Sequence, residues 1–257
     1  MTAEPAPSSR PLLVMPTYNE SLSLPGVLAR LLTRPGALHV LVVDDASPDN
    51  TAGLVQAHPE FNRRLFLLKR SGKLGLGSAY REGFAWALAR DYTAAIEMDA
   101  DLSHDPDDVP RLLATLDSGA DLAIGSRYVK GISVVHWPLS RLLLSIGAGY
   151  YVRLLTGLPL TDPTSGFKAI RRAALAELSA AKVGADGYGF QIELHFTAHR
   201  AGFRLQEVPI VFTERRDGQS KLSLAITFEA IGLVPRLALR RVSGRKPARL
   251  EPAGKNA

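Results

Sequence analysis

The sequence predicts an α/β fold, in which a mostly parallel β-sheet is covered by helices on both faces. Short, wholly apolar runs alternate with segments of helical periodicity, and several of the apolar runs end in acidic residues. Strands that are apolar on both faces are typical of parallel sheets buried under helices. Because ligands of such sheets bind beyond the carboxyl ends of the strands, the acidic residues predict a binding site at one edge of the sheet.

The first half of the chain carries this alternation most regularly. The helix predicted at Leu76–Arg90, for example, places Ala79, Phe84 and Leu88 on its inner face. The predicted strands of this half are Leu12–Met15, Val40–Val43, Arg64–Lys69, Thr93–Met98 and Asp121–Gly125, and the other helices are Val27–Leu32, Thr51–Ala57 and Asp107–Leu116.

After Tyr128 the pattern becomes less regular. Helices are predicted at Leu139–Leu155 and Gln191–His199, and strands at Phe167–Ile170 and Val208–Phe212. The last helical stretch, Leu222–Leu239, is amphipathic, is interrupted by Pro235 and leads into a basic tail. We therefore expect a helical segment appended to the main domain.

Composition and charge limit the class of protein. The chain has 257 residues, 46% of them hydrophobic, and therefore can bury a sizeable core. It has no cysteine, which excludes disulfides and thiolate metal sites. The net charge of +6 favours an anionic partner. Aromatic residues do not alternate with Lys and Arg along a strand, so we expect no nucleic-acid partner.

Asp99 and Asp101 follow the fourth predicted strand and are separated by one residue. In an extended chain, residues two apart point the same way, so both carboxylates can face one site. Two oxygen ligands with an open remainder suit Mg²⁺ or Mn²⁺ bridged to phosphates. The alternative is a solvated acidic loop in which Ser103 or Asp105 caps the following helix.

Two further strand ends and a glycine-rich turn add to this edge. Asp44 and Asp45 close the second strand and can accept hydrogen bonds from a base or ribose, whereas Tyr18 and Glu20 supply an aromatic face and a carboxylate after the first. Lys73 opens a Gly-rich turn before a helix, where backbone amides can approach an anion. Packing and turn formation are the alternative roles of these residues.

The ordered set of motifs resembles the polyprenol (dolichol) phosphate mannosyltransferases of the inverting GT-A glycosyltransferase superfamily. The resemblance covers Leu12–Leu224. The motifs that carry it are Met15–Glu20 (MPTYNE), Val43–Thr51 (VDDASPDNT), Lys73–Gly77 (KLGLG), Met98–His104 (MDADLSH), Gly125–Tyr128 (GSRY), Asp162–Phe167 (DPTSGF) and Arg215–Lys221 (RRDGQSK).

The resemblance implies a GT-A (Rossmann-like) fold and a role for each matched residue. The residues implied in nucleotide binding are Pro16, Tyr18, Glu20, Asp44, Asp45, Lys73 and Asp99. Those implied in metal binding are Asp99, Asp101 and Ser103, and many relatives have Gln at the position of Ser103. Arg127, Arg141, Ser165, Gly166, Arg215, Ser220 and Lys221 are implied at the acceptor phosphate and its loop. Asp101, Arg127 and Arg215 are implied in catalysis.

The implied reaction moves mannose from GDP-mannose to a polyprenyl phosphate with inversion and with Mg²⁺ or Mn²⁺ as cofactor. The alternative is a UDP-sugar donor of glucose or an amino sugar. A polyprenol tail stays in the bilayer, and the longest uncharged apolar stretch, Leu142–Val152, falls short of the roughly 20 residues of a membrane span. We therefore expect a peripheral enzyme on the cytoplasmic face of the membrane, with a separate integral membrane subunit as a possible partner.

Two amphipathic segments, Leu139–Leu155 and Leu222–Leu239, are candidates for membrane contact, and their alternative role is to cover the sheet. The expected organisation is a disordered leader (1–10), a GT-A catalytic domain (11–221), amphipathic membrane-proximal helices (222–241) and a basic disordered tail (242–257).

Overall fold

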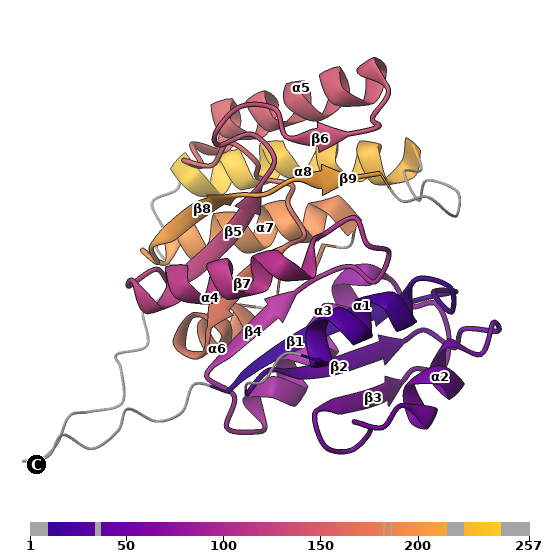
Figure 1. Ribbon diagram of the computed structural model, residues 1–257. Coiled ribbons are helices and arrows are strands. Elements are labelled where there is room, and N and C mark those ends of the chain that lie inside the picture. The colour runs from indigo at the N-terminus through magenta and orange to yellow at the C-terminus, as the bar shows by residue number, and fades with distance from the viewer. Residues whose placement is uncertain (1–9, 34–36, 182, 186, 215–223, 243–257) are drawn as a thin grey trace, which may run out of the picture.

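The computed structural model describes residues 10–33, 37–181, 183–185, 187–214 and 224–242. A seven-stranded sheet in the order β3-β2-β1-β4-β7-β5-β8 forms its centre (Figure 1). Its strands are β1 (Pro11–Thr17), β2 (His39–Asp44), β3 (Leu65–Lys69), β4 (Ala94–Glu97), β5 (Leu122–Ser126), β7 (Lys168–Arg171) and β8 (Leu205–Pro209). A small second sheet pairs β6 (Val134–Val135) with β9 (Phe212–Thr213). The predicted mostly parallel α/β fold is confirmed.

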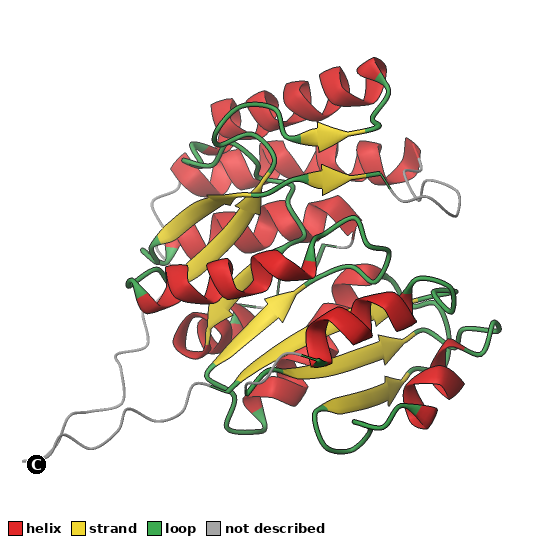
Figure 2. Cartoon of the chain, in the orientation of Figure 1, coloured by secondary structure: helices red, strands yellow, loops and turns green. Residues whose placement is uncertain are grey.

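Helices cover both faces of the large sheet (Figure 2). Leucines and valines of α1 (Leu24–Leu32), α2 (Thr51–Ala57) and α4 (Val109–Asp117) share one core with alternate strand residues such as Leu13 and Met15. The other core joins Leu12 and Val14 to the helices α3 (Leu76–Leu88), α5 (Leu139–Thr156), α6 (Arg172–Ala180), α7 (Gly187–Arg200) and α8 (Leu224–Val242). Adjacent strand residues thus enter different cores, as the alternation of a pleated strand requires.

One strand runs against the others. β7 pairs antiparallel with both β4 and β5, whereas every other pairing in the large sheet is parallel. The beginning of β7 therefore lies at the edge where its neighbours end. This brings the segment that precedes β7 to the same edge as the residues that follow β4 and β5.

Two predictions about the second half were wrong. The predicted strand Val208–Phe212 is divided between β8 and β9, because the chain leaves β5 after Pro209 and turns to pair with β6. The helix α8 continues through Pro235 and is not interrupted there. Pro235 is exposed while Val234 and Leu237 are buried, so tertiary packing on both sides of the proline holds the helix together.

Candidate active site

The carboxyl ends of β1, β2, β4 and β5 meet at one edge of the sheet. Seven of the predicted site residues lie on the loops that follow these strands: Tyr18, Glu20, Asp45, Asp99, Asp101, Ser103 and Arg127. At the tip of this edge Thr17 of β1 lies opposite Asp44 of β2 in the strand register. The predicted convergence of acidic strand ends is therefore what the parallel topology produces.

Asp44 is a buried carboxylate that organises the loop after β2. Its Oδ1 accepts the hydroxyl of Thr17 at 2.9 Å and that of Ser47 at 2.6 Å, and its Oδ2 accepts the Ser47 N–H at 3.0 Å. The Ser47 hydroxyl in turn accepts the N–H of Asn19 at 3.0 Å. Asp44 thus ties the loops after β1 and β2 together.

Asp45 faces a different set of donors. Its Oδ1 accepts Arg70 Nη1 at 2.6 Å, and its Oδ2 accepts the Leu74 N–H at 3.2 Å. Burial raises the pKa of Asp45, although Arg70 and the Leu74 N–H partly oppose the rise. Arg70 also contacts Glu82 at 3.1 Å, and its side chain is 2% exposed. The Gly-rich turn before α3 is therefore fixed to Asp45 by Arg70 and a backbone N–H.

Tyr18 and Lys73 lie together in this part of the site. The Lys73 ammonium is 4.5 Å from the centre of the Tyr18 ring, which is a cation–π distance. Pro16 and Glu20 lie on either side of Tyr18 in the chain, and both are partly exposed. The Glu20 carboxylate accepts a hydrogen bond from the Ser23 hydroxyl at 2.8 Å. The residues predicted for nucleotide binding on β1, β2 and the Gly-rich turn therefore form one continuous group.

The loop after β4 is a tight turn built on Asp101. Asp101 Oδ1 accepts both the N–H of Ser103, at 3.1 Å, and its hydroxyl, at 2.6 Å. Leu102, between them, has a φ of 62°, a left-handed conformation that leucine rarely adopts. Asp105 caps the short 3₁₀ helix η1 (Pro106–Asp108) by accepting the Asp107 N–H at 2.9 Å. The predicted capping role therefore exists beside the acidic pair.

His104 supports the other half of this loop. Its Nδ1 accepts the Asp99 N–H at 3.3 Å and lies 3.8 Å from Asp99 Oδ2. The ring stacks on Phe167 at 4.9 Å and meets Phe212 edge-on at 5.4 Å. Burial lowers the pKa of His104 to about 4, so the ring is neutral near pH 7 and Nδ1 can accept a hydrogen bond. His104 thus supports the backbone of Asp99.

Asp99 and Asp101 fit a divalent cation by the chemistry of their donors. Both are carboxylates on one short loop, and the Asp99 side chain is 39% exposed. Mg²⁺ and Mn²⁺ bind oxygen ligands and commonly use one or two carboxylates together with substrate phosphates. Ser103 is buried and its hydroxyl donates to Asp101. Among the described residues, no group of three or more His, Cys, Asp or Glu side chains gathers as a metal site.

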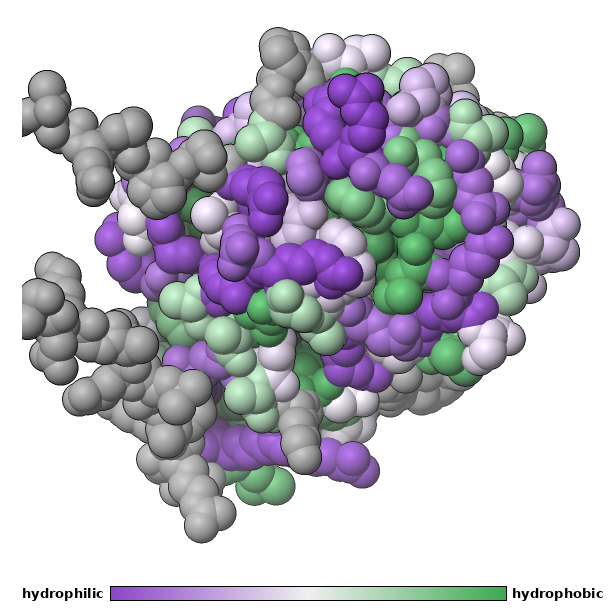
Figure 3. Space-filling view, turned by 90° about the horizontal axis from the view of Figure 1, so that it is seen from below, coloured by the Kyte–Doolittle hydropathy of each residue, from purple (hydrophilic) through white to green (hydrophobic). Residues whose placement is uncertain are grey.

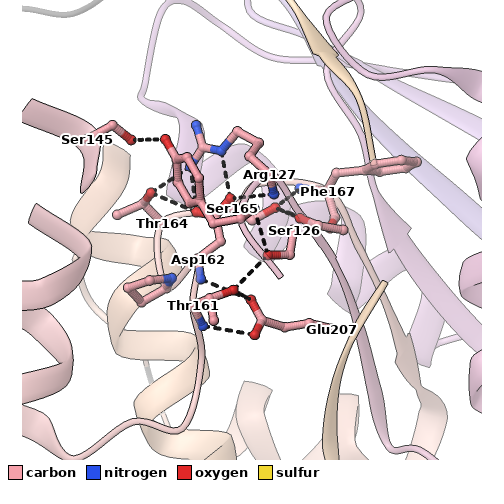
Figure 4. A network of polar contacts seen from close by, with 12 residues as sticks. Ser126, Arg127, Ser145, Thr161, Asp162, Thr164, Ser165, Phe167 and Glu207 are labelled. Atoms are coloured by element: carbon pink, nitrogen blue, oxygen red, sulfur yellow. Dashed lines mark hydrogen bonds and ion pairs between the residues drawn. The ribbon is translucent and has the colours of Figure 1, made fainter. Parts of the chain in front are cut away.

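Arg127, which follows β5, is held by a buried carboxylate (Figure 4). Asp162 accepts Arg127 Nε at 2.6 Å, Nη2 at 2.5 Å and its backbone N–H at 3.1 Å. Thr164 Oγ1 accepts Nη2 at 2.8 Å. Burial opposes the charge of Asp162, but the Arg127 guanidinium and N–H outweigh it and lower the pKa of Asp162. Arg127 therefore has a fixed position.

Of the other predicted acceptor residues, Ser165 and Gly166 follow Thr164 in the loop that contacts Arg127, and Arg141 lies on α5. The Ser165 hydroxyl donates to the Gly125 carbonyl at 2.6 Å, and Gly166 follows it in the same loop. Arg141 of α5 forms an ion pair with Glu214 and lies 4.3 Å from the centre of the Trp137 ring. Arg127 also faces Trp137, at 5.4 Å, so one indole lies near both guanidinium groups. Arg215, Ser220 and Lys221 lie outside the described residues.

Several supporting residues were not found from the sequence. Arg70 directly follows β3, so the rule that drew attention to the other strand ends applies to it as well. Glu207, Lys168 and His195 carry no such signal. Lys168 is wholly buried and pairs with Glu97 at 3.0 Å across the antiparallel β4–β7 contact. Only the folded chain shows what these residues touch.

Comparison with known proteins agrees with this geometry. Residues 12–179 match the model of glycosyl transferase family 2. The polyprenol monophosphomannose synthase of Mycolicibacterium smegmatis is 45% identical over 238 residues, which are 91% of this chain and 89% of that protein. The undecaprenyl-phosphate mannosyltransferase of Micrococcus luteus is 45% identical over 90% of this chain and 94% of its own. The chain belongs to glycosyl transferase family 2, within its group of polyprenyl-phosphate mannosyltransferases.

Solved structures agree on the fold. Glucosyl-3-phosphoglycerate synthase from Mycobacterium tuberculosis, in complex with Mn²⁺, UDP-glucose and phosphoglyceric acid, superimposes with a TM-score of 0.67 at 21% identity. The superposition covers 90% of this chain and 80% of that one. The predicted GT-A fold is therefore confirmed.

Proposed function

We propose that this protein transfers mannose from GDP-mannose to a polyprenyl monophosphate, with inversion, and releases GDP. The 45% identity to mannosyltransferases over 91% of the chain supports this proposal most strongly. The arrangement of the strands agrees with it, because the loops after β1 and β2 lie on one side of the Asp99–Asp101 loop and Arg127, after β5, lies on the other.

The proposed reaction needs no strong general base. A lipid phosphate is already anionic near neutral pH, so its oxygen attacks the anomeric carbon without a proton being removed first. One bond forms between that oxygen and the sugar while the bond to the nucleoside diphosphate breaks on the opposite face. The demand on the protein is instead to hold two anions close together.

Different residues hold the donor and the acceptor in this proposal. Tyr18, Asp45 and their neighbours bind and orient the nucleoside, while Arg127 and Arg141 present the acceptor phosphate. Both guanidinium groups are already bonded to carboxylates, Asp162 and Glu214, so their positions are fixed before the phosphate arrives. When bound by Asp99 and Asp101, with Ser103 beside them, Mg²⁺ or Mn²⁺ supplies Lewis-acid stabilisation of the departing diphosphate. Arg215, Ser220 and Lys221 are proposed to complete the phosphate site.

A donor panel tests the proposal. Purified enzyme is given polyprenyl phosphate with GDP-mannose, UDP-glucose or a UDP-amino sugar, and with Mg²⁺ or Mn²⁺, and the lipid product is identified by mass. The expected result is mannolipid from GDP-mannose alone. If product forms only from a UDP-sugar, the donor is the UDP-sugar of the alternative reaction and not GDP-mannose.

Membrane contact is proposed at α5. Five apolar side chains of this helix are each more than half exposed, with values of 68% for Leu139, 61% for Leu143, 55% for Leu144, 65% for Tyr150 and 80% for Leu154. Figure 1 places α5 at the outer end of the molecule, and α8 packs between it and α7. The opposite side, seen in Figure 3, shows mainly hydrophilic side chains with a smaller hydrophobic area. No helix of the described chain has the length and apolarity to span a bilayer.

Vesicle binding tests this surface. The variant Leu143→Glu/Leu154→Glu is compared with wild type by co-sedimentation with anionic lipid vesicles, and Leu54→Glu on α2, remote from α5, serves as control. Burying an apolar side chain at an interface contributes about 1.5–3 kcal/mol. The double variant is therefore expected to remain in the supernatant, whereas wild type sediments with the vesicles. Equal binding by all three proteins would refute the assignment. We propose the cytoplasmic face of the membrane as the location, with an integral membrane subunit as a possible partner.

A further inference from the structure

Behind the acceptor arginine lies a second carboxylate, Glu207 of β8. Its Oε1 accepts the Thr161 hydroxyl at 2.8 Å and the Asp162 N–H at 2.9 Å, and its Oε2 accepts the Thr161 N–H at 2.8 Å. Figure 4 shows Glu207 reaching across from its strand to the loop that carries Asp162. One side chain thus fixes two consecutive residues of that loop.

Other contacts also hold this loop. The His195 Nδ1 lies 2.9 Å from the Pro163 carbonyl, and the Ser126 and Thr161 hydroxyls are 3.0 Å apart. Asp162 itself is wholly buried, and its carboxylate accepts hydrogen bonds from the Arg127 side chain, the Arg127 N–H and the Thr164 hydroxyl. A shift of the Thr161–Asp162 backbone would therefore move the carboxylate that sets the direction of Arg127.

We propose that Glu207 is a positioning residue for the acceptor phosphate: it holds the Asp162 carboxylate, and Asp162 holds Arg127. This inference rests on the proposed function, since it assigns Arg127 to the acceptor. Glu207 touches neither substrate in this role. Its three bonds are to the loop, so its effect on turnover passes through Arg127.

The two acceptor oxygens of Glu207 matter because all three of its partners in the loop donate. A carboxylate offers acceptors on both oxygens, whereas an amide offers one acceptor and one NH₂ group. In Glu207→Gln the NH₂ group would face either the Thr161 N–H or the pair formed by the Thr161 hydroxyl and the Asp162 N–H. At least one donor of the loop would lose its acceptor, in a substitution that leaves size nearly unchanged.

Acceptor and donor parameters, measured separately, test the role. Glu207→Gln is expected to raise the KM for polyprenyl phosphate about tenfold or more, because a small displacement of Arg127 would misplace the acceptor phosphate. The Kd for GDP is expected to stay within about twofold, because the nucleotide-binding loops lie on other strands. Thr161→Val, which removes only the hydroxyl, is expected to show a smaller rise, and Thr161→Ser none. Glu60→Gln, an equivalent change beside Arg64 away from the site, serves as the matched control.

The outcomes distinguish failure of the positioning role from failure of the proposed reaction. The positioning role would be overturned if Glu207→Gln left the acceptor KM unchanged, or if it changed the GDP affinity and the acceptor KM equally. Turnover by the wild-type enzyme would still support the proposed reaction in that case. If Glu207→Gln does not fold, Thr161→Val against Thr161→Ser decides in the same way. Wild-type enzyme that makes no mannolipid from any polyprenyl phosphate would overturn the proposed function, and this inference with it.

Discussion

His195 gives the stability of the protein a dependence on pH that can be isolated. The ring is wholly buried, and Nδ1 donates to the Pro163 carbonyl at 2.9 Å because a carbonyl can only accept. The other nitrogen, Nε2, is buried and has no hydrogen-bond partner in the described structure. Protonating it would place a charge in the core, so burial lowers the pKa of His195 to about 3, with the nearby Lys168 as a further cause.

The sign and size of the effect follow from linkage. Between the unfolded pKa of about 6.5 and the folded value of about 3, the unfolded chain binds a proton that the folded chain does not. Stability therefore falls as the pH falls through this window. From pH 7 to pH 5 the contribution of His195 amounts to a loss of about 2 kcal/mol, since the unfolded histidine becomes protonated while the folded one stays neutral.

The matched variant is His195→Asn, whose amide can still donate to Pro163 but does not titrate. Urea unfolding of wild type and variant is followed at pH 7 and pH 5 by tryptophan fluorescence at constant ionic strength. The variant is expected to start less stable because it leaves a cavity, but to lose about 2 kcal/mol less than wild type across the same interval. Other buried histidines contribute equally to both proteins. Identical losses in the two proteins would refute the assignment of a neutral, buried His195.

Three other perturbations probe the site and its support. Asp101→Ala is expected to lower kcat/KM by at least ~10²-fold, the scale of one electrostatic stabiliser, and turnover within a few-fold of wild type would exclude Asp101 from the chemistry. His104→Leu, which removes the acceptor of the Asp99 N–H, is expected to lower kcat more than His104→Asn, which can retain it; equal kcat values would contradict the supporting role. Lys168→Met leaves Glu97 charged and unpaired and is expected to destabilise the fold by about 3–5 kcal/mol in urea unfolding, whereas Lys168→Met/Glu97→Gln recovers part of this loss. No recovery in the double variant would show that the pair is not coupled.

The sequence was informative wherever one short segment carried its own signal. The apolar strands, and the acidic residues at their ends, could be located because a parallel sheet buries both faces and gathers strand ends at one edge. The strand β8 was misplaced because it lies at the edge of the sheet, where Gln206 and Glu207 interrupt the apolar run. An edge strand has one partly exposed face, so its composition resembles that of a loop.

The supporting contacts could not be predicted in the same way. Glu207 and Thr161 are 46 residues apart in the chain, and Lys168 and Glu97 are 71 apart. Nothing local distinguishes Glu207 from a solvated surface residue, or Lys168 from a charge facing water. Their roles depend on which strands are neighbours, and the antiparallel insertion of β7 decides this. The resemblance implied which residues face substrate, but not which residues hold them in place.

The reversed direction of β7 separates two groups of loops along the chain. The loops proposed to bind the nucleotide and the acidic turn precede residue 105, whereas the long segment between β5 and β7 supplies α5 and the loop of Asp162. That segment leaves the edge of the sheet after Ser126 and returns to it at Lys168, so its two ends lie beside each other in the sheet. We expect a chimaera that receives this segment from another transferase to change the choice of acceptor while retaining the donor specificity of the host.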